Sequence, residues 1–225
     1  MTTTTVTARA VLLDMDGTLV NSDAVVERVW RRWADRHGLA GDEVLKVVHG
    51  RQGHLSMAIL LPGRPVEENL AENRLMLAEE AADTEGVVPV AGARAFLASL
   101  EGFPHALVTS ADDTLARVRM SAAGLPLPPV MVTAELVTAS KPNPEGFLAA
   151  AARLGVDPSD CLVLEDSEAG VAAGLAAGMR VLGIGPRAAA HEPTFHVLDL
   201  TGVAVAVDDG AVSLTLPDGV RSITP

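Results

Sequence analysis

Short apolar runs rich in Val and Leu recur along this chain, and their spacing constrains the fold more than any other feature. Each run is bounded by turn residues, and longer stretches with helical spacing of apolar residues lie between the runs. Because short continuous strands that alternate with helices are typical of βαβ units, the pattern predicts an α/β fold, with a Rossmann-like, mostly parallel sheet flanked by helices. The predicted strands are residues 10–14, 105–110, 129–135, 161–166 and 180–185.

One interval breaks this rhythm. Between residues 21 and 85 we find no convincing strand, and the apolar residues have helical spacing instead. We therefore predict a separate small helical module at 21–85, inserted into a core that is built from 1–20 and 86–225. Its expected helices are residues 23–39, 41–50 and 64–86, with a polar, glycine-broken loop at 47–56.

Three further features concern packing. Trp30 and Trp33 share the apolar face of the first inserted helix, so they are expected to pack within the module. Cys161 lies inside an apolar run and is expected to be an inert core residue. The tail at 203–216 alternates around Asp209-Gly210, which predicts a hairpin added at the edge of the fold, and we assign it no function.

The charge of the chain narrows the class of partner. Its formal net charge is -12, and Lys46 and Lys141 are its two lysines. Because nucleic-acid surfaces need clustered Lys and Arg, we expect no nucleic-acid partner. No run of 18 apolar residues suits a membrane span, and the start lacks the pattern of a signal peptide. With a single cysteine as well, we expect a cytoplasmic protein, as a monomer or dimer.

Polar side chains follow the predicted strands where the strands end. In open α/β sheets, ligands bind in the crevice beyond the carboxyl ends of the strands, so these residues are the first candidates for a site. Taken singly, each is more often a helix cap or a turn residue, but together they indicate one shared site. They are Asp14, Asp16, Thr109, Ser110, Glu165 and Asp166, with Lys141 in the loop after the third strand.

The chemistry of this set predicts its ligands. Four carboxylates at one rim repel each other unless a cation lies among them. Oxygen ligands without nearby His or Cys suit Mg²⁺. A lysine, hydroxyl groups and backbone N–H groups at helix N-termini suit a phosphate. A carboxylate that is free to attack phosphorus then allows phosphoryl transfer through an aspartyl phosphate.

Four short motifs carry a resemblance to a known family. "DMDGT" (14–18), "VTS" (108–110), "KP" (141–142) and "EDSEAG" (165–170) resemble the four ordered motifs of the haloacid dehalogenase-like superfamily. The helical insert after the first motif resembles the subgroup with a helical cap, which includes 2-deoxyglucose-6-phosphatase, glycerol-3-phosphatase and β-phosphoglucomutase. The resemblance implies a phosphatase that needs Mg²⁺ and hydrolyses a small phosphorylated metabolite, a sugar or polyol phosphate.

The resemblance also implies a role for each acidic position. Asp14 would be the nucleophile that forms the aspartyl phosphate. Asp16 would protonate the leaving oxygen and then take a proton from the hydrolytic water. Mg²⁺ would be held by a carboxylate oxygen of Asp14, the backbone carbonyl of Asp16 and the carboxylate of Asp166. Glu165 would act through metal-bound water.

The remaining motif residues are implied to hold the phosphate. Thr109 would donate its hydroxyl to a phosphoryl oxygen, and Lys141 would neutralise charge on both Asp14 and the phosphate. Ser110, Gly17 and Thr18 are expected beside the same group.

Substrate choice is expected to depend on the insert, which would close over the rim and exclude water. Arg51 resembles the cap arginine that meets substrate in related sugar phosphatases and mutases. His49 and His54 are candidates to line the same opening, with the alternative that both are solvated loop residues.

Two rival functions remain open. A hexose-phosphate mutase would use the same aspartyl phosphate, but its pattern has a histidine ten residues after the second aspartate, where this chain has Val26. A non-catalytic phosphoacceptor or phosphate-binding protein also clusters acids, a hydroxyl and a lysine at one rim. Catalytic release of phosphate, as opposed to stable stoichiometric phosphorylation, distinguishes the enzyme from such a protein.

Overall fold

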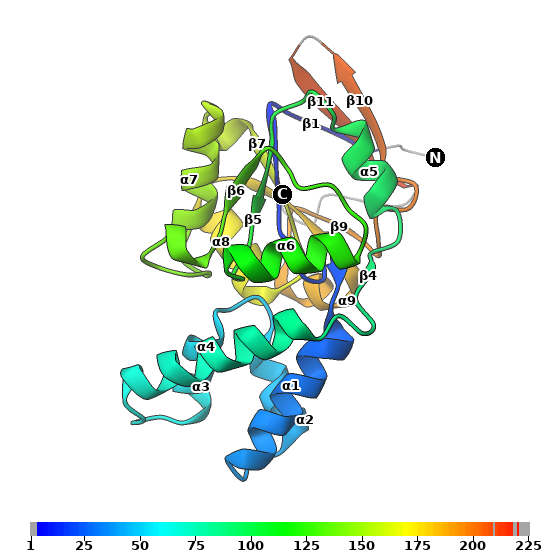
Figure 1. The fold of residues 1–225 in the computed structure, drawn as a ribbon. Helices are drawn as coiled ribbons and strands as arrows, with labels where there is room; N and C mark the ends of the chain where they lie inside the picture. The colour runs from blue at the N-terminus through cyan, green and yellow to red at the C-terminus, as the bar shows by residue number, and fades with distance from the viewer. Residues whose placement is uncertain (1–3, 209, 218–219, 221–225) are drawn as a thin grey trace.

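A six-stranded parallel sheet forms the centre of the molecule (Figure 1). The computed structural model describes residues 4–208, 210–217 and 220. The strand order is β6-β5-β2-β7-β8-β9, with every neighbouring pair parallel, which confirms the predicted α/β class. The strands are β2 (Ala10–Leu13), β5 (His105–Val108), β6 (Val130–Val132), β7 (Cys161–Glu165), β8 (Arg180–Ile184) and β9 (Phe195–Val197).

Helices cover both faces of this sheet, so the central strand β2 is apolar and buried along its whole length. On β2, Val11 and Leu13 face one core cluster, and Ala10 and Leu12 face the other. The first cluster includes residues of α5 (Ala93–Ser99) and α6 (Asp113–Ala122). The second includes residues of α7 (Glu145–Leu154) and α8 (Glu168–Ala176), and Cys161 is buried there as expected; the short α9 (Gly185–Ala188) follows β8.

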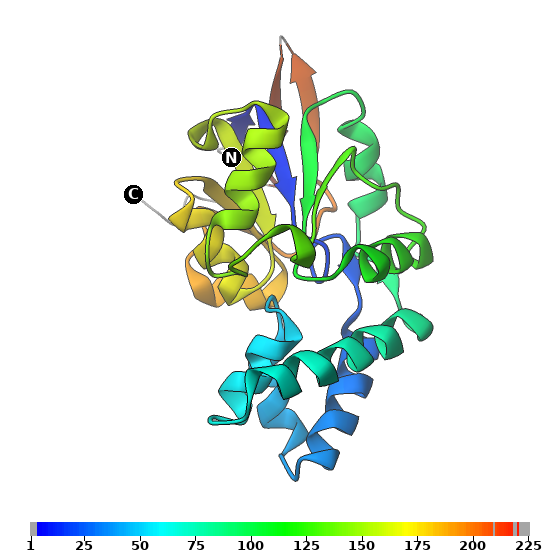
Figure 2. The same cartoon turned by 60° about the vertical axis from the view of Figure 1, so that its left-hand side comes forward.

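The inserted cap is helical, as predicted, and lies beyond the carboxyl ends of the strands (Figures 1 and 2). Trp33 is fully buried and packs edge to face against Trp30, with the ring centroids 5.3 Å apart. Among the described residues no helix has the length and apolar character needed to span a bilayer. The cap helices are α1 (Asp23–Arg36), α2 (Gly41–Val48), α3 (Gly53–Leu60) and α4 (Val66–Ala82).

Helix α3 corrects the sequence analysis, which predicted a loop over 47–56. The loop is shorter, because the chain becomes helical again at Gly53. Only Ser56 and Met57 of this helix are buried. Two inward positions in a segment of eight residues are too few to show helical spacing in the sequence.

The chain leaves and re-enters the core at one place. There β3 (Val20–Asn21) pairs antiparallel with β4 (Val88–Pro89). The two connections to the cap are therefore hydrogen-bonded neighbours, close to the ends of the predicted insert.

The predicted hairpin is present as β10 (Ala204–Asp208) and β11 (Ala211–Thr215), which pair antiparallel, while Asp209 of its turn lies outside the described residues. It is not an edge of the parallel sheet. It forms a separate three-stranded sheet with β1 (Thr5–Ala8), at the end of the core far from the cap (Figures 1 and 2). The sequence analysis did not predict β1.

Candidate active site

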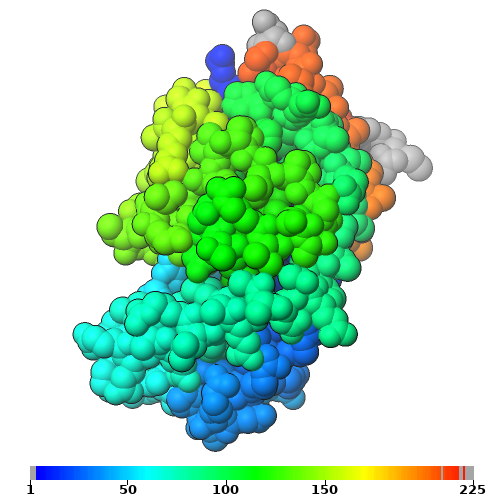
Figure 3. Space-filling view, viewed as in Figure 1, coloured from blue at the N-terminus to red at the C-terminus, as the bar shows by residue number. Residues whose placement is uncertain are grey.

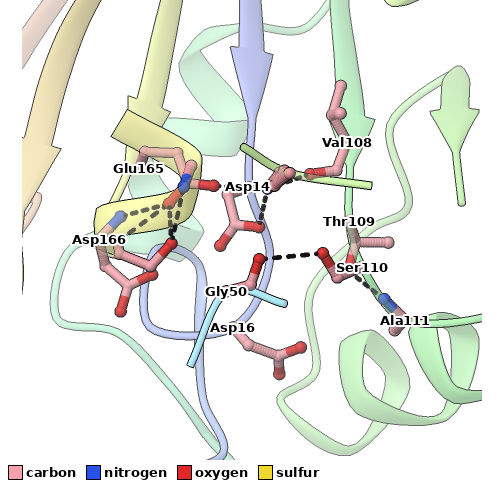
Figure 4. Close-up of polar contacts among 12 residues, drawn as sticks. Asp14, Asp16, Gly50, Val108, Thr109, Ser110, Ala111, Glu165 and Asp166 are labelled. Atoms are coloured by element: carbon pink, nitrogen blue, oxygen red, sulfur yellow. Dashed lines mark hydrogen bonds and ion pairs between the residues drawn. The ribbon is translucent and has the colours of Figure 1, made fainter. Parts of the chain in front are cut away.

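A buried lysine links three of the strand-end residues. Lys141 Nζ donates hydrogen bonds to Asp14 Oδ1 at 2.7 Å, Glu165 Oε1 at 2.5 Å and the carbonyl oxygen of Val108 at 3.0 Å (Figure 4). Burial alone would lower the pKa of Lys141, but the neighbouring carboxylates Asp14 and Glu165 raise it, so the ammonium group stays charged.

Asp14, Glu165 and Asp166, three of the four carboxylates expected at one rim, form an acidic cluster. Each offers a carboxylate oxygen, and these oxygens lie within 4.8 Å of one another. Burial raises the pKa of Asp14 well above its ordinary value, with Glu165 adding to the shift and Lys141 opposing it. Burial and Glu165 also raise the pKa of Asp166, to about 7. Without a cation, this cluster holds negative charge at a cost.

The donors in this cluster fit a hard divalent cation. Asp166 Oδ1 is buried and, among the described residues, has no hydrogen-bond partner. Its other oxygen, Oδ2, accepts a hydrogen bond from Arg187 Nε at 2.9 Å. Both oxygens of Glu165 already have hydrogen-bond partners. Oε2 accepts from Ser167 Oγ and two backbone N–H groups, and Oε1 accepts from Lys141 Nζ. Of these two acids, Asp166 is therefore the one with an oxygen left for a metal.

Asp16 lies apart from this cluster and points to other partners. Its Oδ1 accepts from Ser22 Oγ at 2.7 Å, and its Oδ2 accepts from Arg119 Nη1 at 2.7 Å. Arg119 Nη2 also donates to Glu80 Oε2 in the cap at 2.6 Å. The two aspartates of the first motif thus have separate surroundings.

A cavity opens between the core and the cap. Its core wall includes Thr109, whose Oγ1 accepts from the backbone N–H of Ala111, and Ser110, whose Oγ donates to the carbonyl of Gly50 in the cap (Figure 4). On the face shown in Figure 3, α6 and α4 meet without a gap. The core contributes Asp14, Asp16, Thr109, Ser110, Arg119 and Arg187 to the lining, and the cap contributes Val26, Trp30, His49, Arg51, Asn73, Met76 and Glu80 among others.

The cap loop approaches the core closely at Gly50. This residue has a φ of +75°, and a Cβ there would lie 2.0 Å from Ser167 Oγ. A glycine is required for both reasons. The close approach brings His49 and Arg51, on either side of it, to the cavity. Burial lowers the pKa of His49, and the charge of Arg187 adds to this, which favours the neutral imidazole.

Three predicted residues lie away from the cavity wall. Gly17 takes the turn after β2 at a φ of +87°, where a Cβ would lie 2.0 Å from Asp166 Oδ2. Thr18 is fully buried behind this turn, and His54 begins the first turn of α3 outside the cavity. Contact of these three with substrate stays a prediction.

The sequence analysis missed Arg119, Glu80, Ser22 and Arg187. Arg119 had a readable signal, because it lies three and four residues after Ala116 and Leu115, on the buried face of α6. Glu80 likewise follows the buried Met76 by one helical turn. A charge on an apolar helix face indicates a buried partner, although the sequence does not say which one.

Comparisons with known proteins agree with this geometry. The family model of the haloacid dehalogenase-like hydrolases matches residues 8–178 of this chain. The chain is 44% identical over 191 residues to hexitol phosphatase A of Escherichia coli (strain K12), with 84% of this chain and 88% of that protein covered. It is 36% identical to validoxylamine A 7'-phosphate phosphatase of Streptomyces hygroscopicus subsp. limoneus, covering 78% and 85%. The crystal structure of a β-phosphoglucomutase from Clostridium difficile shares the fold, with a TM-score of 0.77, 19% identity and coverage of 88% and 93%.

Proposed function

The chain belongs to the haloacid dehalogenase-like hydrolases, and we propose that it is a Mg²⁺-dependent phosphatase that hydrolyses a small sugar or polyol phosphate through an aspartyl phosphate. One observation carries the proposal. Asp14 is buried beside Lys141 and the carboxylates of Glu165 and Asp166, while Asp16 lies on the wall of the same cavity with separate partners.

Asp14, Asp166 and Glu165 are the side chains that would hold Mg²⁺, together with the backbone carbonyl of Asp16. The bound ion would supply positive charge that favours an ionised Asp14 and a phosphoryl group with spread negative charge. Lys141 holds its proton throughout and keeps one oxygen of Asp14 fixed, which leaves the carboxylate aimed and charged.

In the first step, an oxygen of Asp14 attacks phosphorus and forms a new P–O bond as the ester P–O bond breaks. Asp16 gives its proton to the departing sugar or polyol oxygen. In the second step, Asp16 takes a proton from water, the water oxygen attacks phosphorus, and the bond to Asp14 breaks. Inorganic phosphate and a free Asp14 remain. Thr109 and Ser110, on the cavity wall, hold the phosphoryl oxygens.

The cap residues and the relatives together support a small sugar or polyol as the leaving group. We place its boundaries at 21–85, because the chain crosses between core and cap at the paired β3 and β4. Arg51 and His49 line the cavity from the cap. The relative named hexitol phosphatase A favours a polyol phosphate as substrate.

Val26 presents an apolar side chain to the cavity where a mutase would have its histidine. This favours hydrolysis over transfer of the phosphoryl group back to the sugar. A cytoplasmic location and a monomeric or dimeric state stay predictions.

The test is release of inorganic phosphate from a panel of hexitol, hexose, glycerol and nucleotide phosphates. It is run with Mg²⁺, with chelator, and with Asp14→Asn. Asp113→Asn is the matched control, because Asp113 is an exposed residue that pairs with Arg117 on its own helix. We expect turnover of a sugar or polyol phosphate that requires Mg²⁺ and Asp14 and survives Asp113→Asn. Stoichiometric, stable phosphorylation without turnover would contradict the proposal and indicate a phosphoacceptor protein.

A further inference from the structure

Three charged side chains form a continuous chain across the border between core and cap. One guanidinium group, that of Arg119, bonds Asp16 Oδ2 at 2.7 Å through Nη1 and Glu80 Oε2 at 2.6 Å through Nη2. The Arg119 side chain is 5% exposed and that of Glu80 is 9% exposed. Because the guanidinium group is a rigid planar fork, the direction of one carboxylate is tied to the position of the other.

The members of this chain come from opposite sides of the border. Arg119 belongs to α6 of the core, and Glu80 lies near the end of α4 in the cap. These two helices pack against each other, as the space-filling view shows (Figure 3). Asp16 is also held by Ser22, which precedes the first cap helix. The positions of both Asp16 carboxylate oxygens therefore depend on how the cap packs against the core.

Packing alone does not account for Arg119. Its neighbours on the buried face of α6 are Leu115, Ala116 and Met120, and an apolar residue would continue that face. Buried ion pairs often add nothing to stability relative to apolar residues of similar volume. Burial raises the pKa of Glu80 to about 7, even though Arg119 opposes the shift, so the charge at this place is costly.

We propose that Arg119 is a positioning residue that aims the Asp16 carboxylate at the leaving oxygen, and that Glu80 makes this aim depend on the closed cap. The inference rests on the proposed function, since it matters only if Asp16 gives its proton to the leaving group. Arg119 keeps all its own protons. Asp16 is then correctly placed only in the state in which the cap excludes water from the cavity.

The test compares two substrates that differ in their need for a proton. The leaving group of a hexitol phosphate is an alcohol that must be protonated, whereas that of p-nitrophenyl phosphate departs as a stable anion. Arg119→Lys keeps the charge but loses the fork. We expect kcat on the hexitol phosphate to fall about 100-fold with KM little changed, as for a misplaced catalytic group. On p-nitrophenyl phosphate the loss should stay within about threefold, because little acid catalysis is needed there.

Matched controls separate positioning from general damage. Arg117→Lys changes an exposed arginine on the same helix, and Glu79→Gln changes a glutamate that pairs with Arg32 inside the cap. Glu80→Gln preserves the side-chain volume and carries the test if Arg119→Lys does not fold. We expect Glu80→Gln to lower kcat on the hexitol phosphate about tenfold, with the same preference for p-nitrophenyl phosphate.

Equal losses on both substrates would overturn the positioning role, and a Glu80→Gln variant that behaves like Glu79→Gln would overturn the dependence on the cap. Phosphate release by the wild-type enzyme is measured separately and tests the proposed function. The ratio of the two losses in each variant tests the inference, so the two failures are distinguishable.

Discussion

Ion pairs in this molecule occur in two settings that differ in burial. At the border between core and cap, the side chains of Lys141 and Asp14 are only 6% and 7% exposed. Within the cap, the paired side chains of Lys46 and Glu43 are both 67% exposed. The distances are similar, at 2.7 Å and 2.6 Å, so the geometry of a pair does not distinguish the two settings.

This difference in burial determines what an ion pair costs in stability. An exposed pair gains little and costs little, because water screens both charges. A buried pair loses its hydration, and removal of one partner leaves an uncompensated charge. We therefore expect chemistry, rather than stability, to account for the charges of the buried clusters around Lys141 and Arg119.

The strongest test of this contrast is Asp14→Asn. We expect phosphatase activity to fall by at least about 10⁴-fold, as for loss of a nucleophile. In chelator, the free energy of unfolding should rise at the same time, because burial and Glu165 already favour an uncharged Asp14 and Lys141 keeps Glu165 as its partner. Phosphate release and urea denaturation measure the two effects. A variant that is both inactive and less stable would contradict the view that this charge is kept for function.

A smaller effect is expected from Arg187→Gln. Arg187 holds Asp166 Oδ2 and also bonds Asp23 at the start of α1, so it orients a proposed metal ligand from outside the metal site. Loss of such a contact typically weakens metal binding about 10- to 100-fold. Calorimetric titration with Mg²⁺ measures this without turnover. Arg180→Gln is the control, because Arg180 is an arginine at the other end of β8 that bonds the carbonyl of Thr7. Equal Mg²⁺ affinity in both variants would contradict the role.

The pH dependence of stability sharpens the comparison further. Burial raises the pKa of Glu80 to about 7 from an ordinary value of 4.5, so between these values the folded state binds more protons than the unfolded state. Stability from this site is then full below about pH 4.5 and is lost as pH rises to about 7. The shift corresponds to at most about 3 kcal/mol.

Urea denaturation in chelator at pH 5 and pH 8 checks this expectation. The wild type should lose more stability between the two pH values than Glu80→Gln does. Glu79→Gln should lie close to the wild type, because the charge of Glu79 is the smallest of the causes that shift the pKa of Glu80. Asp166 contributes to the loss in all three proteins, so the difference between them isolates Glu80. An equal loss in all three would show that Glu80 does not titrate in this range.

The smallest effect is expected at the exposed pair of Lys46 and Glu43. Lys46→Gln should change the free energy of unfolding by no more than about 0.5 kcal/mol and leave activity unaltered. Thermal or urea denaturation and phosphate release are sufficient to check it. A large loss of activity would show that the exposed pairs of the cap also take part in the reaction.

One topological rule lets the sequence predict which residues lie together at the ends of the strands. Asp14, Thr109, Glu165 and Asp166 each follow a buried apolar run, and parallel strands end at a common edge. The grouping of these acids therefore follows from the pattern of strands, whereas Lys141 reaches them from the loop after β6. The central strands of the core follow from the same pattern.

Contacts that depend on how helices dock are not predictable in this way. Arg119 meets Asp16 across 103 positions and Glu80 across 39, and neither spacing has a periodic signature. Strand β1 was missed for a related reason. Its alternation spans only four residues, and its partner β11 lies near the other end of the chain. Local patterns indicate elements, whereas their pairing across long separations is decided by packing.

The pairing of β3 with β4 has a consequence for how such a protein can change over time. The chain leaves for the cap and returns from it through two adjacent hydrogen-bonded strands. The length of the insert therefore does not change the spacing of the strands in the parallel sheet. A longer, shorter or different set of helices can be joined at that place without a new strand order. The proposed reacting groups at the ends of the strands can thus be inherited unchanged while the cap, which we propose meets the sugar or polyol, is replaced.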